Sequence, residues 1–205
     1  MCGNRSSGDI LLARDADYLG FVICTPRSRR SLEIRDAVPL FREASQYAKT
    51  VAVVTDAESG FLEMVSSELE PDYIQLHILL SAAEIADAAE TVSSGIIALA
   101  KPERSFAEAA RDIASLADIL MVDTFRNEMS GGTGAVHDWS ASRVLREAIY
   151  PAKLMLSGGL NPANVEEAIR TVGPAIVDVS GGVESDGLKS IELVQAFIRK
   201  AGCSM

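Results

Sequence analysis

Histidine, aromatic side chains and clustered positive charge are scarce in this 205-residue sequence. It has 2 His, aromatic residues make up 5% of it, and 19 Lys and Arg stand against 29 Asp and Glu, a formal charge of −10. This surplus of negative charge repels a phosphate backbone, so nucleic-acid binding would need a local basic stripe. The only dense one is Arg27, Arg29 and Arg30, which suits one anion. We therefore expect no nucleic-acid partner.

Long apolar runs are also lacking. None approaches the roughly 20 residues of a membrane span, and the first residues lack the apolar core of a signal peptide. Three cysteines, Cys2, Cys24 and Cys203, are too few and too widely spaced for a disulfide framework or a zinc pattern. With His77 and His137 as the only histidines, we expect no metal site. The sequence predicts a cytoplasmic protein with free thiols and no membrane contact.

Apolar residues are plentiful enough for a sizeable core. The sequence is 48% hydrophobic and 23% charged, which excludes a disordered chain. Barrels of alternating strands and helices form single domains of about 200 to 250 residues. We therefore expect one domain over residues 1–205.

Short apolar runs recur along the sequence, their starts separated by 22 to 34 residues. Each interval holds one helix and two loops, so the pattern predicts βα units with strands buried on both faces. The predicted strands are Tyr18–Ile23, Val51–Thr55, Tyr73–His77, Ile96–Ala100, Ile119–Asp123, Lys153–Ser157 and Ile176–Ser180. The predicted helices are Asp9–Ala13, Phe61–Leu69, Ser81–Glu90, Phe106–Leu116, Trp139–Ile149, Asn164–Val172 and Ile191–Ile198. Ser81 and Glu84 have the spacing of a capping box.

Seven such units in succession favour a closed (β/α)8 TIM barrel. Only Met1 and Cys2 precede the turn-rich stretch Gly3–Gly8, so the first strand is expected to be truncated or missing. Two explanations remain open: the recorded start codon lies downstream of the true one, or the barrel closes with a stub.

Glycine-rich loops follow three of the last predicted strands. In barrel enzymes, loop amides at this end of the strands often bind phosphate, and glycine allows the backbone to approach an oxyanion. A single glycine pair is more simply a turn, but three such loops together predict a phosphorylated small-molecule ligand. The predicted phosphate-binding residues are Gly132, Gly134, Gly158, Gly159, Ser180, Gly181 and Gly182.

Asp123, Cys2 and Arg30 are the candidates for chemistry at the same ends. Desolvation would favour the neutral form of Asp123 and prepare it to donate a proton, although a loop cap is an equal alternative. Cys2, at the end of the missing strand, could act as a base once deprotonated. The Arg30 guanidinium could clamp a carboxylate, or belong to a solvated basic loop. His77 is more simply a hydrogen-bonded packing residue.

These motifs together resemble phosphoribosylanthranilate isomerases of tryptophan biosynthesis. The similarity runs through Cys2-Gly3, Asp17–Val22, Pro26–Arg30, Ile74–His77, Gly131–Trp139, Ser157–Pro162 and Asp178–Glu184, and so covers nearly the whole chain. The chain departs from the family pattern at its missing strand, at Asn4 in place of isoleucine, at Ile78 in place of glycine, and at 135–137 in place of Lys-Thr-Phe.

The resemblance implies an Amadori rearrangement of N-(5-phosphoribosyl)anthranilate without a cofactor. It implies Asp123 as the general acid, Cys2 as the base, Arg30 as the ligand of the anthranilate carboxylate, and the glycine loops as the phosphate site. His77 and Asp178 are candidate substrate contacts. The expected assembly is a monomer or homodimer.

Two other hypotheses remain. One is a non-catalytic phosphate-binding barrel descended from the isomerase, suggested by the missing strand and altered loops. The other is a sugar-phosphate epimerase or a Schiff-base aldolase, which would need metal-binding histidines or a reactive Lys101.

Overall fold

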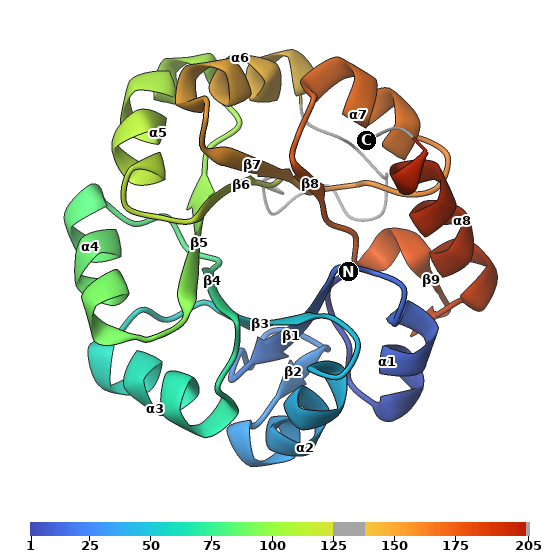
Figure 1. Cartoon of the computed structure of the whole chain (residues 1–205). Helices are drawn as coiled ribbons and strands as arrows, with labels where there is room; N and C mark the ends of the chain where they lie inside the picture. Colours follow the sequence, from blue (N-terminus) through green and yellow to red (C-terminus); the bar gives the residue numbers. More distant parts are fainter. Residues whose placement is uncertain (125–137, 204–205) are drawn as a thin grey trace. The chain divides into compact units, whose positions relative to one another are not determined.

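The computed structural model describes residues 1–124 and 138–203. Contacts divide the chain into two compact units, Met1–Leu99 with Leu116–Asp118, and Ala100–Ser115 with Ile119–Met205. Each unit contains parallel strands with helices packed along one side of them (Figure 1). The alternation of strand and helix predicted from the sequence is present in both units.

The first unit is built on a parallel sheet in the order β2-β1-β3-β4-β5. Its strands are β1 (Tyr18–Ile23), β2 (Ser31–Leu32), β3 (Lys49–Val54), β4 (Tyr73–Leu76) and β5 (Gly95–Ala100). In β3 every residue after Lys49 is buried, as expected where both faces of a sheet are covered. The strands predicted near residues 18, 51, 73 and 96 are therefore confirmed.

Four helices belong to this unit: α1 (Ser7–Ala13), α2 (Ile34–Ala44), α3 (Ser59–Leu69) and α4 (Ala82–Thr91). The capping box predicted at the start of α4 is present. Ser81 Oγ accepts a hydrogen bond from Glu84 N (3.3 Å), and the Glu84 carboxylate accepts one from Ser81 N (2.8 Å). Hydrogen bonds from Ser81 lower the pKa of the Glu84 carboxyl, because they favour its charged form.

Helix α2 is a helix that the sequence pattern did not define. Pro39 lies inside it, and an internal proline removes a hydrogen bond and normally ends a helical pattern. Ala37, Phe41 and Ala44 form its buried face, and the Phe41 ring packs on Phe21 of β1 with centroids 4.7 Å apart. Packing of this apolar face outweighs the hydrogen bond that Pro39 cannot donate.

The segment Met1–Asn4 precedes α1 and runs beside β1. The Met1 amino group donates to Tyr18 O (2.7 Å), and Gly20 N donates to Met1 O (2.9 Å). This is the pattern of a parallel ladder. Gly3 has a φ of 74°, and the next bond to β1 comes from Asn4 N to Gly20 O (3.1 Å). This short segment paired with β1, Met1–Asn4, is the stub beside β1.

The second unit contains the parallel strands β6 (Ile119–Val122), β7 (Lys153–Leu156) and β8 (Ile176–Val177), in the order β6-β7-β8. Its helices are α5 (Ala107–Ala114) with the preceding turn η1 (Arg104–Phe106), α6 (Trp139–Ile149), α7 (Val165–Val172) and α8 (Ile191–Gly202). Strand β8 is shorter than the predicted run to Ser180. Asp178 N still donates to Leu156 O (2.9 Å), after which the chain turns into η2 (Gly181–Val183).

A small antiparallel hairpin follows η2, formed by β9 (Glu184–Ser185) and β10 (Leu188–Lys189). Its two turn residues, Asp186 and Gly187, have φ values of 52° and 78°. An Asp-Gly pair with both φ angles positive is the preferred two-residue hairpin turn. This hairpin is absent from the elements predicted from the sequence.

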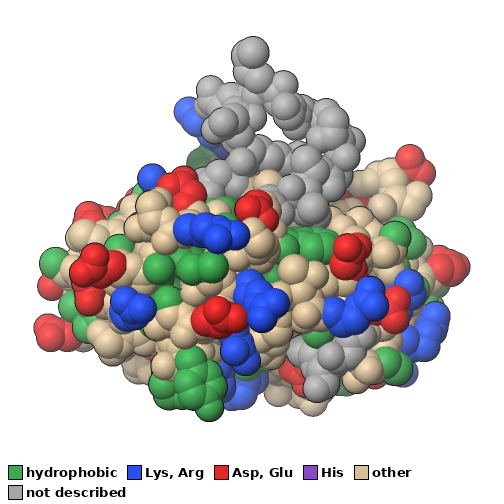
Figure 2. All heavy atoms as spheres, turned by 90° about the horizontal axis from the view of Figure 1, so that it is seen from above, with side chains coloured by type: hydrophobic (Ala, Val, Ile, Leu, Met, Phe, Trp, Pro, Cys, Tyr) green, Lys and Arg blue, Asp and Glu red, His purple; other side chains and the backbone are tan. Residues whose placement is uncertain are grey.

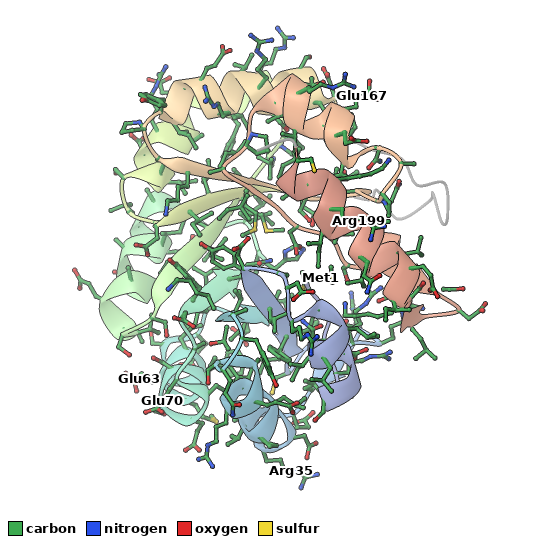
Figure 3. All side chains as sticks on the ribbon, turned by 45° about the vertical axis from the view of Figure 1, so that its right-hand side comes forward. Met1, Arg35, Glu63, Glu70, Glu167 and Arg199 are labelled. Carbon is green, nitrogen blue, oxygen red and sulfur yellow. The ribbon has the colours of Figure 1, made fainter. Side chains whose placement is uncertain are left out.

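Charged side chains lie on the outer surface. Figure 3 shows Arg35 on α2, Glu63 on α3 and Glu70 at its end on the outer side of their elements. On the face drawn in Figure 2, basic and acidic side chains of the described residues are interspersed, without a continuous basic stripe. Within residues 1–124 and 138–203, no helix combines the length and apolarity needed to cross a membrane.

Candidate active site

Cys2 lies half-buried in the stub that runs beside β1. Gly20 provides the surface against which it packs: a Cβ atom built on Gly20 would lie 3.2 Å from Cys2 Sγ and 3.3 Å from Cys2 Cα. A larger residue at position 20 would press on the cysteine. The Cys2 thiol therefore packs directly on the backbone of Gly20, which has no side chain to separate them.

Arg30 belongs to the loop between β1 and β2. Ser28 N donates to Thr25 O (2.9 Å), Thr25 N donates to Ser31 Oγ (2.8 Å), and Arg30 N donates to Ser28 Oγ (3.2 Å). These bonds order the loop around Arg30. Arg30 is half-buried, whereas Arg27 and Arg29 are exposed. Burial thus distinguishes Arg30 from Arg27 and Arg29, and its role as a carboxylate ligand stays a prediction.

His77 follows β4 and is half-buried. Its backbone N donates to Val54 O (2.8 Å), and its Nδ1 lies 3.1 Å from Nε2 of the buried Gln75. The Gln75 amide and the His77 ring are therefore within hydrogen-bonding distance. Gln75 was not singled out from the sequence, although its spacing of two residues from His77 places both on one face of the strand.

Asp123 follows β6 directly and is half-buried. The loop after β7 passes close to it: a Cβ built on Gly158, whose φ is 87°, would lie 2.7 Å from Asp123 Oδ1 and would collide with Thr124 N and Oγ1. The contact requires glycine for its space and for its positive φ. The structure thus brings together one predicted catalytic residue and one predicted phosphate-binding residue.

The loops after β7 and β8 also meet within this unit. Ser157 Oγ donates to Asp178 Oδ2 (3.4 Å). Asn164 Nδ2 donates to Gly159 O (3.0 Å), and Asn164 Oδ1 accepts from Asn161 N (2.8 Å). The two asparagines order the loop that contains Gly158 and Gly159, a role that their presence in the sequence did not reveal.

The Gly181-Gly182 pair begins η2, directly after half-buried Ser180. A Cβ on Gly182 would collide with Leu160 O and lie 2.9 Å from Leu160 C and 3.0 Å from Asn161 Cβ. Only glycine allows this close approach of the two loops. Gly132 and Gly134, the remaining predicted phosphate-binding glycines, lie outside the described residues.

Substituting Gly182 with alanine is expected to lower the free energy of unfolding by about 1–3 kcal/mol, because backbone must move to admit the methyl group. If the two loops bind phosphate, the substrate KM should also rise. Denaturant unfolding and steady-state kinetics measure both effects. Gly202→Ala is the matched control, since nothing lies within 4 Å of its Cβ position; an equal loss in both variants would contradict the packing argument.

The predicted residues therefore form two groups, one in each unit. Cys2, Arg30 and His77 belong to the first unit, and Asp123, Asp178 and the described glycines belong to the second. Each follows a parallel strand or, for Cys2, lies in the stub beside β1. Among the described residues, no three His, Cys, Asp or Glu side chains gather into a metal-binding cluster. The first unit thus offers a thiol and a guanidinium, and the second unit offers a carboxyl group and glycine-rich backbone.

Comparison with known proteins identifies the family. The family model for N-(5'-phosphoribosyl)anthranilate isomerase matches residues 1–200. The isomerase of Methanothrix thermoacetophila is 36% identical over 189 residues, which cover 92% of this chain and 89% of that protein. The isomerase of Rhodopseudomonas palustris is 36% identical, covering 100% of this chain and 95% of that protein.

Solved structures agree. The crystal structure of phosphoribosylanthranilate isomerase from Thermotoga maritima superposes with a TM-score of 0.85 at 31% identity, covering 99% of this chain and 97% of that one. The predicted (β/α)8 barrel class is thereby confirmed. With the family model spanning residues 1–200 and relatives above 30% identity matching over nearly their full length, this chain belongs to the N-(5'-phosphoribosyl)anthranilate isomerase family.

Proposed function

We propose that this chain catalyses the Amadori rearrangement of N-(5-phosphoribosyl)anthranilate to 1-(2-carboxyphenylamino)-1-deoxyribulose 5-phosphate. The observation that carries the proposal is the family match over residues 1–200. The reaction moves protons and breaks one C–O bond, so the side chains it needs are an acid, a base and groups that hold two anionic ends of the substrate. Candidates for each are present at the ends of parallel strands, where barrel enzymes place their chemistry.

Asp123 is the proposed general acid. It gives a proton to the furanose ring oxygen as the bond from this oxygen to C1 breaks, and the lone pair on the anthranilate nitrogen forms the C1=N iminium. Its half-buried position and its contact with Gly158 support this role, because a general acid must be held within reach of the atom it protonates.

Cys2 is the proposed base. Its thiolate takes the proton from C2, the released electron pair forms the C1=C2 bond, and the iminium electrons return to nitrogen. The resulting enolamine loses its enol O–H proton and gains one at C1, which leaves a ketone at C2. No cofactor is required, since the substrate nitrogen accepts and returns the electron pair. Support comes from the half-buried thiol seated on Gly20.

The two anionic ends of the substrate have separate proposed sites. Half-buried Arg30 pairs with the anthranilate carboxylate, for which a planar guanidinium is well shaped. Backbone amides around Gly158, Gly159, Ser180, Gly181 and Gly182 hold the phosphate, together with Gly132 and Gly134. The glycine contacts between these loops support the phosphate site.

The complex of a related protein supports a small phosphorylated ligand. A phosphoribosylanthranilate isomerase has been solved in complex with reduced 1-(o-carboxyphenylamino)-1-deoxyribulose 5-phosphate; it is 29% identical, with a TM-score of 0.81, over 98% of this chain and 96% of that one. We place the same kind of small phosphorylated ligand here, with His77 and Asp178 as additional contacts. We also propose a single cytoplasmic domain over residues 1–205 that works as a monomer or homodimer.

Purified protein supplied with N-(5-phosphoribosyl)anthranilate is expected to abolish the substrate's fluorescence with time, at a rate proportional to protein concentration. Calorimetry with the same substrate provides the second measurement. Binding without conversion would overturn the proposal and indicate a phosphate-binding barrel that lacks turnover. Heat-treated protein is the control for spontaneous breakdown of the substrate.

A further inference from the structure

We infer that Asn4 is a positioning residue that holds the Cys2 thiol in place. The inference rests on the proposed function for what the thiol does, but its evidence is the hydrogen bonding of the first four residues. Met1, labelled in Figure 3, begins this segment, and Asn4 ends it. Asn4 is fully buried, with 0% of its surface exposed.

The side chain of Asn4 ties the stub to β1. Its Nδ2 donates to Met1 O (3.1 Å) and to Gly20 O (3.0 Å). The same two carbonyls also take part in main-chain bonds, Met1 O with Gly20 N (2.9 Å) and Gly20 O with Asn4 N (3.1 Å). Cys2 lies between these attachments. Asn4 therefore binds the carbonyl of the peptide bond that precedes Cys2 and, through both its side chain and its main chain, the carbonyl of Gly20 in β1.

The side-chain bonds of Asn4 add to the main-chain bonds between the stub and β1. The regular ladder is limited to Met1, because the positive φ of Gly3 shifts the next bond to Asn4. The Asn4 amide adds two hydrogen bonds to the main-chain bonds of this segment. Displacement of a reacting group by about 1 Å can cost on the order of 10²-fold in rate.

Core stability does not explain an asparagine at this position. Among the described residues, Asn4 Oδ1 is buried and has no hydrogen-bond partner, and such an orphan acceptor costs about 1–3 kcal/mol. A leucine of the same branching would avoid this cost. The two donated bonds are what the amide supplies: one reaches the carbonyl of the peptide bond that precedes Cys2, and the other reaches Gly20, against which Cys2 packs.

Kinetics of Asn4→Leu test the inference. The variant keeps the side-chain shape but loses both donors, so kcat is expected to fall by about 10- to 100-fold, with KM changed by no more than about twofold. In a Cys2→Ser background the same substitution should have almost no further effect, because residues that act as a unit are not additive. Equal kcat for Asn4→Leu and wild type, or the same loss with and without Cys2, overturns the inference.

Thr50→Val is the matched control for general destabilisation. Thr50 is 2% exposed and exchanges hydrogen bonds with Asp72 (both 3.2 Å) in the same unit. Its loss removes buried hydrogen bonds to Asp72 that do not involve residues 1–4, so kcat should stay at the wild-type value. A loss of kcat matching that of Asn4→Leu would assign the effect to stability and reject positioning.

A second measurement does not depend on turnover. The rate of Cys2 alkylation by iodoacetamide, followed by mass spectrometry across pH, reports the environment of the thiol. Asn4→Leu should change this pH–rate profile several-fold at Cys2 and leave the exposed Cys203 unchanged. Unchanged pH–rate profiles at both cysteines reject the inference, whether or not the wild-type protein is active. Inactivity of the wild-type protein rejects only the proposed function. If Asn4→Leu does not fold, Asn4→Ala takes its place in both experiments.

Discussion

Replacing Asp123 with asparagine is expected to lower kcat by about 10²- to 10⁴-fold, the range that a single general acid contributes. The amide keeps the size of the side chain, so its contact with Gly158 is preserved, but it has no acidic proton to give to the ring oxygen. Steady-state kinetics of substrate consumption measure the effect. KM should change little, since the carboxyl group acts on the transition state and not on the anionic ends of the substrate.

Asp112→Asn provides the control for Asp123. Asp112 is an exposed carboxylate on α5 in the same unit, so its neutralisation changes net charge by the same amount without touching the site. If Asp123→Asn retained wild-type kcat, the acid would have to be another group and the proposed mechanism would be wrong.

The Cys2→Ser variant is expected to lose a similar factor, about 10²- to 10⁴-fold in kcat. Serine keeps the seat on Gly20, but its hydroxyl ionises at far higher pH than a thiol, so the base is nearly absent at neutral pH. Substrate binding, measured by calorimetry, should persist because the phosphate and carboxylate sites are intact. Removal of the proton from C2 is then the step that fails.

The cysteines themselves supply the control. Cys203 is exposed at the end of α8, and Cys203→Ser should retain full activity. Iodoacetamide should inactivate the wild-type protein and Cys203→Ser at equal rates. The opposite result would contradict the assignment of Cys2. If iodoacetamide no longer inactivated Cys203→Ser but still inactivated Cys2→Ser, the thiol whose alkylation stops activity would be Cys203.

The roles of Arg30 and His77 could not be decided from the sequence motifs alone. In the sequence, Arg30 is one of three nearby arginines, and no local rule separates it from Arg27 or Arg29. The turn bonds around Ser28 leave Arg30 half-buried and its neighbours exposed. For His77, the hydrogen bond with Gln75 fits the packing alternative equally well, so its role as a substrate contact stays a prediction.

Local chemistry alone determined much of the fold. The strand runs, most helices and the Ser81–Glu84 cap were predictable because apolar periodicity and capping act over a few residues. The Asp186-Gly187 turn carried an equally local signal. Helix α2 was not predicted, because Pro39 locally disfavours a helix. Packing of its Phe41 on Phe21 outweighs that local preference.

The residue types of the site were readable from the sequence, but their surroundings depended on tertiary structure. Cys2 is seated by Gly20, Asp123 by Gly158, and the Gly182 turn by Leu160. Each of these pairs is separated by 18 to 35 residues in the chain, beyond the reach of propensity or spacing. Only the pairing of strands brings them into contact. The same pairing places the buried Asn4 amide within hydrogen-bonding distance of Met1 O and Gly20 O.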